Sequence, residues 1–258
     1  MQTVDKAFTL LKFFSITKPE IGLSELARLA KFDKAATRRF LVALQNHQFI
    51  EQNPETKAYR LGTGFLSYAN IREEMFPLKA IIQQSLERLT EITAETSHGS
   101  IVNGQILASV AVRLSDRSNR VHIHNSEELP MNATASGFAY LAFAPDIPIR
   151  MRQENLPSFT ELTITDPERL QQSINLVKKT GYSVVRGSFE DDVTGIAVPI
   201  FTSDGFAIGA LAVASPSSRI NEKHTAKICD ALFAETIEVS KALGGKIPPH
   251  YQQLTQAA

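Results

Sequence analysis

The spacing of the apolar residues changes once along the chain, and this change limits the folds that the chain can adopt. Up to about residue 92 the apolar side chains recur three or four positions apart, as they do on one face of a helix. After Ser97 they alternate, as in strands that have one buried face. A helical region followed by a region of strands and helices predicts an α+β protein.

The composition excludes several classes of protein. The chain has 258 residues, of which 43% are hydrophobic, with one cysteine and 27 residues each of basic and acidic type. This apolar content is too high for a disordered chain, and one cysteine cannot support a disulfide scaffold. No apolar run approaches the roughly 20 residues of a membrane helix, and the first residues lack a signal-peptide pattern, so we expect a cytoplasmic protein.

The balanced total charge conceals an asymmetry between two parts of the chain. Residues 1–60 contain ten Lys or Arg and six Asp or Glu, whereas the remaining residues contain 17 and 21. The first part therefore carries a net charge of +4 and the second part −4. A small basic part followed by a larger acidic part suggests two modules with different partners.

The first module has the pattern of three short helices. Apolar residues at helical spacing predict a helix over residues 3–16, and a cluster containing Pro and Gly follows it. Ser24 is expected to cap a second helix and Asp33 a third. Arg38 and Arg39 lie opposite the apolar stripe of the third helix. Two helices joined by a tight turn, with Arg on the outer face of the second, indicate a helix-turn-helix.

A short hairpin is predicted after the third helix. Residues 49–52 and 58–61 have strand character, residues 53–56 form a turn, and Lys57 lies near the tip of this wing. Lys and Arg neutralise phosphates, and Arg can also read guanine edges. The alternative is a winged helix that contacts another protein through solvated Arg. We predict that seven residues contact DNA: Ser24, Lys34, Ala35, Thr37, Arg38, Arg39 and Lys57.

The second module begins with helices and continues with strands. A helix over residues 65–75 is expected to connect the modules, and another helix is expected after Pro77. The apolar stripes of these helices are consistent either with packing against their own module or with a dimer contact. The pattern then predicts strands at 100–102, 105–112, 120–124, 181–185, 193–201 and 206–214, and helices at 135–143, 166–179 and 221–242. A mostly antiparallel sheet flanked by helices is an α+β domain.

Motifs in both modules resemble the IclR family of transcriptional regulators. The matching stretches are 23–30 (LSELARLA), 34–44, 59–62, 129–137 (LPMNATASG), 141–142, 181–182, 195–201, 210–216 and 219–220. Arg39 matches the recognition-helix arginine of the family, whereas Arg38 stands where an aromatic residue is common, Ala35 and Ala36 replace Ser-Thr, and Gln48 replaces a usual Gly.

The resemblance implies a specific domain organisation. It predicts an α+β fold in which an N-terminal winged helix-turn-helix, residues 1–62, is joined by a linker helix, residues 63–76, to a GAF-like, mostly antiparallel α/β sandwich. This last domain, residues 77–258, is expected to bind an effector and to oligomerise. The expected partners are double-stranded DNA with a two-fold operator, a small organic acid, and further copies of the chain in a homodimer or homotetramer.

The segment 133–137 enters a helix whose first N–H groups and positive dipole end favour an anion. A helix simply capped by Thr134 is the plainer alternative. The resemblance implies that Ala135 and Ser136 hold a ligand carboxylate. Family members that sense small polar acids such as glyoxylate carry Asp, Cys and two Ser at sheet positions that are apolar here: Val185, Gly195, Ala212 and Ala214.

An apolar lining does not satisfy a small polar ligand, because each unpaired buried polar group costs on the order of 1–3 kcal/mol. We therefore predict a larger, partly apolar carboxylate, either aromatic or acyl. The alternative is that neighbours such as Phe138 or Phe189 fill the space and the domain senses nothing.

Other candidate sites have weaker support. His122 and His124 share one face of an expected strand without a third metal ligand at a suggestive spacing, and 190–192 is an acidic loop. Cys229 lies at helical spacing among apolar residues. We expect no metal, no cofactor and, since no nucleophile–base pair is evident, no enzymatic activity. A ligand-responsive regulator is favoured over a constitutive or architectural repressor whose second domain only oligomerises, and over a hydrolase fused to a basic domain.

Overall fold

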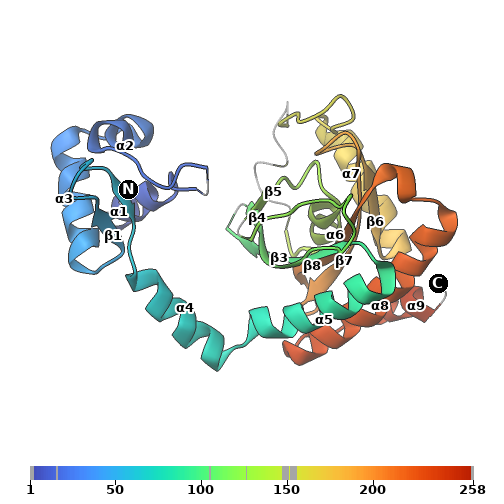
Figure 1. Cartoon of the computed structure of the whole chain (residues 1–258). Coiled ribbons are helices and arrows are strands. Elements are labelled where there is room, and N and C mark those ends of the chain that lie inside the picture. Colours follow the sequence, from blue (N-terminus) through green and yellow to red (C-terminus); the bar gives the residue numbers. More distant parts are fainter. Residues whose placement is uncertain are drawn as a thin grey trace. The chain divides into compact units, whose positions relative to one another are not determined.

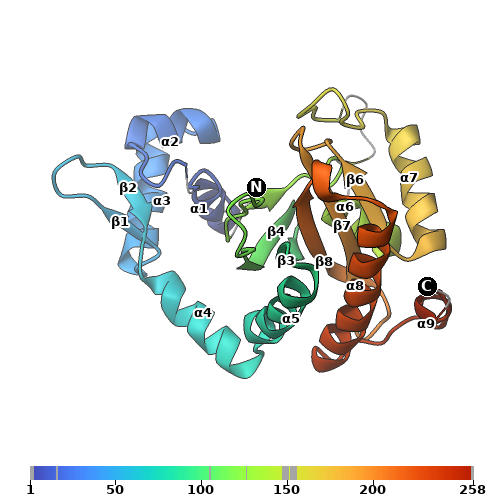
Figure 2. The same cartoon turned by 45° about the vertical axis from the view of Figure 1, so that its right-hand side comes forward.

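The computed structural model describes residues 3–15, 17–104, 106–125, 127–146, 151 and 156–256. The chain forms two compact units, residues 1–77 and 78–258 (Figures 1 and 2). The connecting helix expected over residues 65–75 belongs to the first unit. None of the described helices has both the length and the apolar content that crossing a membrane requires.

The first unit is a winged helix-turn-helix followed by a helix. Its elements are α1 (Thr3–Leu11), α2 (Leu23–Ala30), α3 (Lys34–Asn46), β1 (Ile50–Gln52), β2 (Tyr59–Leu61) and α4 (Gly64–Met75). Strands β1 and β2 pair in antiparallel register, and Ile21 bridges to Tyr59, so the wing is tied to the segment before α2. Leu10, Leu26 and Leu41 are fully buried and bring α1, α2 and α3 to one core.

Helix ends in this unit partly follow the sequence signals. The Asp33 carboxylate accepts a 2.7 Å hydrogen bond from the Ala36 N–H, which confirms the expected cap of α3. The predicted cap at Ser24 is wrong, because α2 already begins at Leu23 and Gly22 occupies the cap position without a side-chain hydrogen bond. Helix α1 ends at Leu11 instead of extending to residue 16, which itself lies outside the described residues.

The second unit is built on a six-stranded antiparallel sheet in the order β5-β4-β3-β8-β7-β6. The strands are β3 (Thr96–Asn103), β4 (Ile106–Arg113), β5 (Glu128–Leu129), β6 (Ser183–Arg186), β7 (Val193–Phe201) and β8 (Ala207–Pro216). The helices are α5 (Leu78–Thr93), α6 (Ala135–Phe143), α7 (Pro167–Thr180), α8 (Glu222–Ala242) and α9 (Pro249–Gln256), with a 3-10 turn at Ser217–Arg219.

Helices cover both faces of this sheet. Helices α5 and α8 pack together on one face, and α6, all of whose residues are buried, packs on the other with α7 beside it (Figure 2). Alternation along β3 separates the faces, because Gly99 lies against Ile82 of α5 whereas its neighbour His98 bonds to Ser136 of α6. The α+β fold predicted from the sequence is confirmed: a winged helix-turn-helix and a mostly antiparallel, GAF-like sandwich.

Two parts of the second unit differ from the expectation. Residues 120–124 form no strand; the edge of β4 pairs with β5 instead, while the Val121 carbonyl accepts a 2.8 Å hydrogen bond from the Thr96 hydroxyl. Helix α9 was not predicted. Its Tyr251 is fully buried and donates a 2.9 Å hydrogen bond to the Gly181 carbonyl, so contacts distant in sequence hold this helix.

A buried ion pair holds the loop that follows β4. The Glu95 carboxylate is fully buried and accepts two hydrogen bonds from the Arg219 guanidinium, of 2.7 and 2.6 Å. A third N–H of Arg219 reaches the Asn119 carbonyl at 2.9 Å. This bidentate pair therefore fastens the segment leading to Val121 against the end of β8.

Candidate functional site

The outer face of α3 carries an exposed set of basic residues. Lys34, Arg38 and Arg39 are exposed and recur at helical spacing, opposite the stripe that α3 buries. No ion pair involving these three side chains occurs within the described part of the chain. Together with Leu23, Ala35 and Val42 they line a shallow hollow between the start of α2 and α3. This face therefore presents unneutralised cations around a concave surface.

The remaining predicted DNA contacts divide into exposed and buried positions. Ser24 is exposed near the start of α2, and Lys57 is exposed at the wing. Thr37 is fully buried, and its hydroxyl donates to the Asp33 carbonyl at 2.9 Å. The prediction that Thr37 touches DNA is therefore withdrawn, because position 37 is one turn before Phe40 and belongs to the inward stripe.

Hydrogen bonds hold the wing in a defined shape. The Asn53 side-chain oxygen accepts from the N–H groups of Glu55 and Thr56, at 2.9 and 3.2 Å. The Gln52 side-chain amide donates to the Lys57 carbonyl at 2.9 Å. The turn thus presents the Lys57 side chain to solvent from an ordered hairpin.

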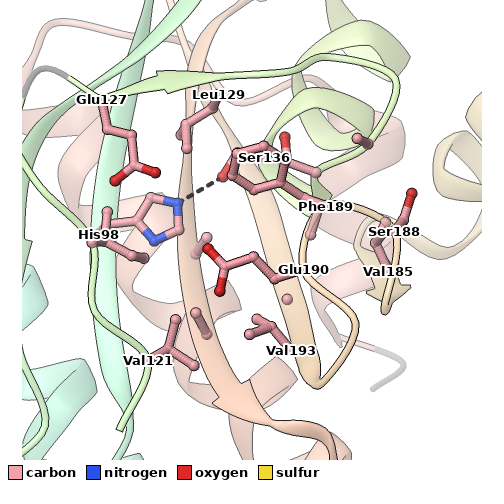
Figure 3. Close-up of a pocket in the computed structure, with 17 residues that line it drawn as sticks. His98, Val121, Glu127, Leu129, Ser136, Val185, Ser188, Phe189, Glu190 and Val193 are labelled. Carbon is pink, nitrogen blue, oxygen red and sulfur yellow. Dashed lines mark hydrogen bonds between the residues drawn. The ribbon is translucent and has the colours of Figure 1, made fainter. Parts of the chain in front are cut away.

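In the second unit, all seven predicted ligand positions line one pocket that opens to solvent (Figure 3). They are Thr134, Ala135, Ser136, Val185, Gly195, Ala212 and Ala214. The other lining residues come from β3, from the 121–129 segment, from the turn before α6, and from the stretch after β6 up to the start of β7: His98, Val121, Ile123, Glu127, Leu129, Ala133, Ser188, Phe189, Glu190 and Val193.

The register of the sheet explains why the sheet positions meet. Gly195 on β7 pairs with Val185 on one side and with Ala214 on the other, while Ala212 pairs with His98. Residues paired across antiparallel strands point to the same face. These positions therefore form a continuous floor under the start of α6, in which Gly195, Ala212 and Ala214 have small side chains or none.

The start of α6 forms one wall of the pocket. The Thr134 hydroxyl caps the helix by accepting from the Gly137 N–H at 3.1 Å. The N–H groups of Ala135 and Ser136 are at the first helical positions, where no carbonyl within a helix can reach them. Gly195 leaves room below them, since a side-chain carbon there would come within 3.1 Å of Ala135 Cβ.

His98 is a pocket residue that the sequence reasoning missed. Its Nε2 lies 3.1 Å from the Ser136 hydroxyl oxygen. Burial lowers the pKa of His98 to about 4, so the imidazole is neutral at physiological pH. Its Nδ1 is buried and has no hydrogen-bond partner in the described structure, and the same is true of the Ser188 hydroxyl oxygen.

Two carboxylates at the mouth were also missed as pocket residues. Figure 3 shows the side chains of Glu127 and Glu190 reaching the space in front of the His98 ring from different segments. Glu127 accepts a 2.9 Å hydrogen bond from the His124 N–H. Burial, reinforced by the nearby Glu127 charge, raises the pKa of Glu190. The pocket mouth is therefore acidic. The sequence shows the acidic loop 190–192, but no local signal indicates that Glu127 lies beside it.

The two aromatic residues considered as fillers lie at different distances from the pocket. Phe138 is buried in the core and is not among the lining residues. Phe189 lines the pocket, with its ring packed edge-on against Phe159 at a centroid distance of 5.2 Å.

Both units match models of one protein family. Residues 3–54 match the IclR helix-turn-helix domain, and residues 74–241 match the bacterial transcriptional regulator IclR C-terminal domain. The chain belongs to the IclR family. It is accordingly a DNA-binding transcriptional regulator, as the sequence motifs implied.

Individual IclR relatives align over almost the whole chain. A crystal structure of a putative IclR transcriptional regulator from Silicibacter sp. TM1040 is 37% identical, covers 96% of this chain and 99% of its own, and has a TM-score of 0.93. The Escherichia coli regulator XynR is 24% identical over 95% of this chain and 98% of its own length. An IclR homologue from Microbacterium hydrocarbonoxydans, solved with 4-hydroxybenzoate, is 20% identical to this chain and has a TM-score of 0.76. It covers 94% of this chain and 99% of its own.

The histidine pair and the cysteine of this IclR-family chain were also considered as candidate sites. The rings of His122 and His124 lie 5.1 Å apart, and no group of three or more His, Cys, Asp or Glu suited to a metal ion occurs among the described residues. Cys229 is buried on α8, and burial raises the pKa of its thiol to about 12. The thiol is therefore protonated and unreactive at physiological pH.

Proposed function

We propose that this IclR-family regulator changes its affinity for a two-fold operator when a partly apolar organic acid, aromatic or acyl, binds in the pocket of its second unit. The observation that carries the proposal is the convergence of all seven predicted ligand positions on one pocket beside the start of α6.

The carboxylate of such an acid has a suitable partner at the start of α6. The N–H groups of Ala135 and Ser136 and the positive end of the helix dipole favour an anion. The Ser136 hydroxyl and the His98 ring add neutral hydrogen-bonding groups beside them. Because the pKa of His98 is near 4, the imidazole contributes a hydrogen bond and no positive charge.

The walls of the pocket favour an apolar ligand body. Val121, Ile123 and Val185 line the pocket beside the small residues Gly195 and Ala212. Such a surface leaves the polar groups of glyoxylate or pyruvate unpaired but packs well against a ring or an acyl chain. The 4-hydroxybenzoate bound by the Microbacterium hydrocarbonoxydans homologue is an acid of this kind and supports the proposal.

The DNA-binding part of the proposal rests on α3 and the wing. We infer that Lys34, Ala35, Arg38 and Arg39 face the major groove, while Ser24 and Lys57 contact the backbone nearby. Two recognition helices related by a two-fold axis match a palindromic operator, so the chain acts as a homodimer or homotetramer in the cytoplasm. In this scheme residues 1–62 bind DNA, 63–76 connect, and 77–258 bind the effector and oligomerise.

The mechanism is thermodynamic linkage. An acid that binds more tightly to one arrangement of the subunits shifts the population toward that arrangement, and operator affinity changes by the same coupling factor. A regulator of this type differs from a constitutive repressor only in this coupling.

The test measures DNA affinity with and without acids. A DNA site is selected from a random pool with the full chain, and its binding is followed by fluorescence anisotropy with benzoate, 4-hydroxybenzoate, hexanoate, glyoxylate or pyruvate. We expect an aromatic or acyl acid to change the Kd at least fivefold, a typical coupling. Much tighter binding of glyoxylate or pyruvate would refute the apolar effector. Acids that bind without changing DNA affinity would establish the constitutive alternative.

A pair of variants localises the effect. Ser136→Ala removes the hydroxyl beside the proposed carboxylate and should weaken acid binding several-fold while preserving the fold. Ser173→Ala makes the same chemical change on α7, where the hydroxyl donates to the Arg169 carbonyl, and should leave acid affinity unchanged. Equal losses in the two variants would place the acid elsewhere.

A further inference from the structure

The pocket proposed for the effector has an acidic side that an organic acid alone does not explain. Glu127 and Glu190 both line it, and the described lining residues include no Lys or Arg. Glu190 forms no ion pair with another described residue. Burial, together with the nearby Glu127 charge, raises the pKa of Glu190, because both disfavour its charged form. An acid approaching through this mouth would meet repulsion.

Two unpartnered polar groups lie in the same pocket. His98 Nδ1 and the Ser188 hydroxyl oxygen are buried without hydrogen-bond partners in the described structure, in side chains whose residues are 6% and 5% exposed. In Figure 3 Nε2 of the His98 ring points to Ser136, while the side chains of Glu127 and Glu190 lie beside the ring. Buried polar groups are normally satisfied, so these atoms indicate a ligand with more than one polar end.

We propose that the effector is a zwitterion: an organic acid whose apolar body also carries a protonated amine, held by Glu127 and Glu190 while the carboxylate lies at the start of α6. This inference rests on the proposed function and narrows its ligand class. The ammonium group neutralises the acidic mouth and donates up to three hydrogen bonds, with carboxylate oxygens as acceptors. A hydroxyl would donate one hydrogen bond and leave both negative charges in place.

The arrangement also gives the ligand a fixed direction. Its negative end lies at the positive dipole of α6 and its positive end at the two carboxylates, with Val121 and Val193 along the apolar middle. A zwitterion in reverse would place like charges together at both ends. Selectivity for amino acids with separated charged groups over simple fatty or aromatic acids follows from this polarity.

The test compares acids that differ only in the amine. The full chain is titrated calorimetrically with 6-aminohexanoate against hexanoate, 5-aminopentanoate against pentanoate, and 4-(aminomethyl)benzoate against benzoate. We expect the amine-bearing acid to bind at least tenfold more tightly in one or more pairs. If the parent acids bind as tightly as their amino derivatives in every pair, the zwitterion proposal fails while the carboxylate effector stands.

Hexylamine and the variants separate the two proposals. If hexylamine binds as tightly as 6-aminohexanoate, the ligand carboxylate contributes nothing to binding. That result would overturn the proposed function and identify the acidic mouth as a cation site. Glu190→Gln should reduce the amino-acid-to-parent affinity ratio about tenfold, and Glu127→Gln should also reduce it. Glu128→Gln neutralises an exposed neighbour outside this pocket and should keep the ratio. A ratio unaffected by Glu190→Gln and Glu127→Gln would overturn the assignment.

Discussion

His98 on β3 and Ser136 at the start of α6 are 38 positions apart in the sequence, yet a 3.1 Å hydrogen bond joins the imidazole Nε2 to the Ser136 hydroxyl oxygen. The bond links the floor of the pocket to the helix end that we propose binds the carboxylate. It also places a titratable ring in a buried position, which makes the stability of the second unit depend on pH.

Stability should fall as the pH is lowered through the range in which unfolded His98 becomes protonated. The pKa is about 4 in the folded protein and 6.5 in the unfolded chain, so the unfolded state binds more protons between these values. The free energy of unfolding should therefore have its full value above pH 6.5. It should decrease as the pH falls toward 4, by up to about 3 kcal/mol.

Urea unfolding at pH 7, 6 and 5 measures this loss. His98→Gln should reduce the decrease, whereas His122→Gln, at an exposed position, should preserve it. The same pH profile in wild type and His98→Gln would show that other groups cause the acid sensitivity.

Arg39→Ala should weaken operator binding and reduce its dependence on salt. Arg39 is exposed on α3, so its removal costs a phosphate or base contact and not the fold. We expect a loss of about 1–3 kcal/mol for a base contact, or a salt slope smaller by about 1 for a phosphate contact. Anisotropy titrations over a range of KCl concentrations, with Arg169→Ala on α7 as control, measure both. Unchanged binding would argue against α3 as the recognition helix.

Gly137→Ala should destabilise the second unit and disturb the pocket. A side-chain carbon at position 137 would lie 2.4 Å from both Cα and O of Met131, so the start of α6 would have to move away from the 130–133 turn. Overpacking of this kind typically costs about 1–3 kcal/mol. Urea unfolding should show this loss, while Gly22→Ala, where nothing lies within 4 Å, should cost less than about 1 kcal/mol. Equal stability of Gly137→Ala and wild type would contradict the close approach.

Gln48→Gly should stabilise the first unit. Gln48 has a φ of 60°, in the left-handed region that a residue with a side chain adopts at a cost, and the family usually has Gly there. We expect a gain of about 0.5–1 kcal/mol after the greater flexibility of unfolded glycine is subtracted. Gln45→Gly, the same change inside α3, should lose about 1 kcal/mol. A loss in both variants would mean that the Gln48 side chain contributes more than its backbone strain costs.

Local signals in the sequence are sufficient to predict much of this protein. Helices α3, α7 and α8 begin after Asp33, Asp166 and Asn221 as expected, because each cap bonds an N–H only three residues ahead. The exposed position of Arg39 and the burial of Phe40 follow from helical periodicity alone. The motifs were sufficient to predict the family and the DNA-binding function, because their order and spacing along the chain are those of the family.

Contacts between distant segments determined the remainder. Thr37 is buried because α3 packs on other helices, and residues 120–124 leave the sheet because β5 occupies the edge of β4. The chemistry of the pocket is of this second kind. His98, Glu127 and Glu190 lie in unrelated stretches of sequence, and only strand pairing and the packing of α6 bring them together. Periodicity reports which face of an element is buried, whereas register and packing decide which buried or rim residues meet.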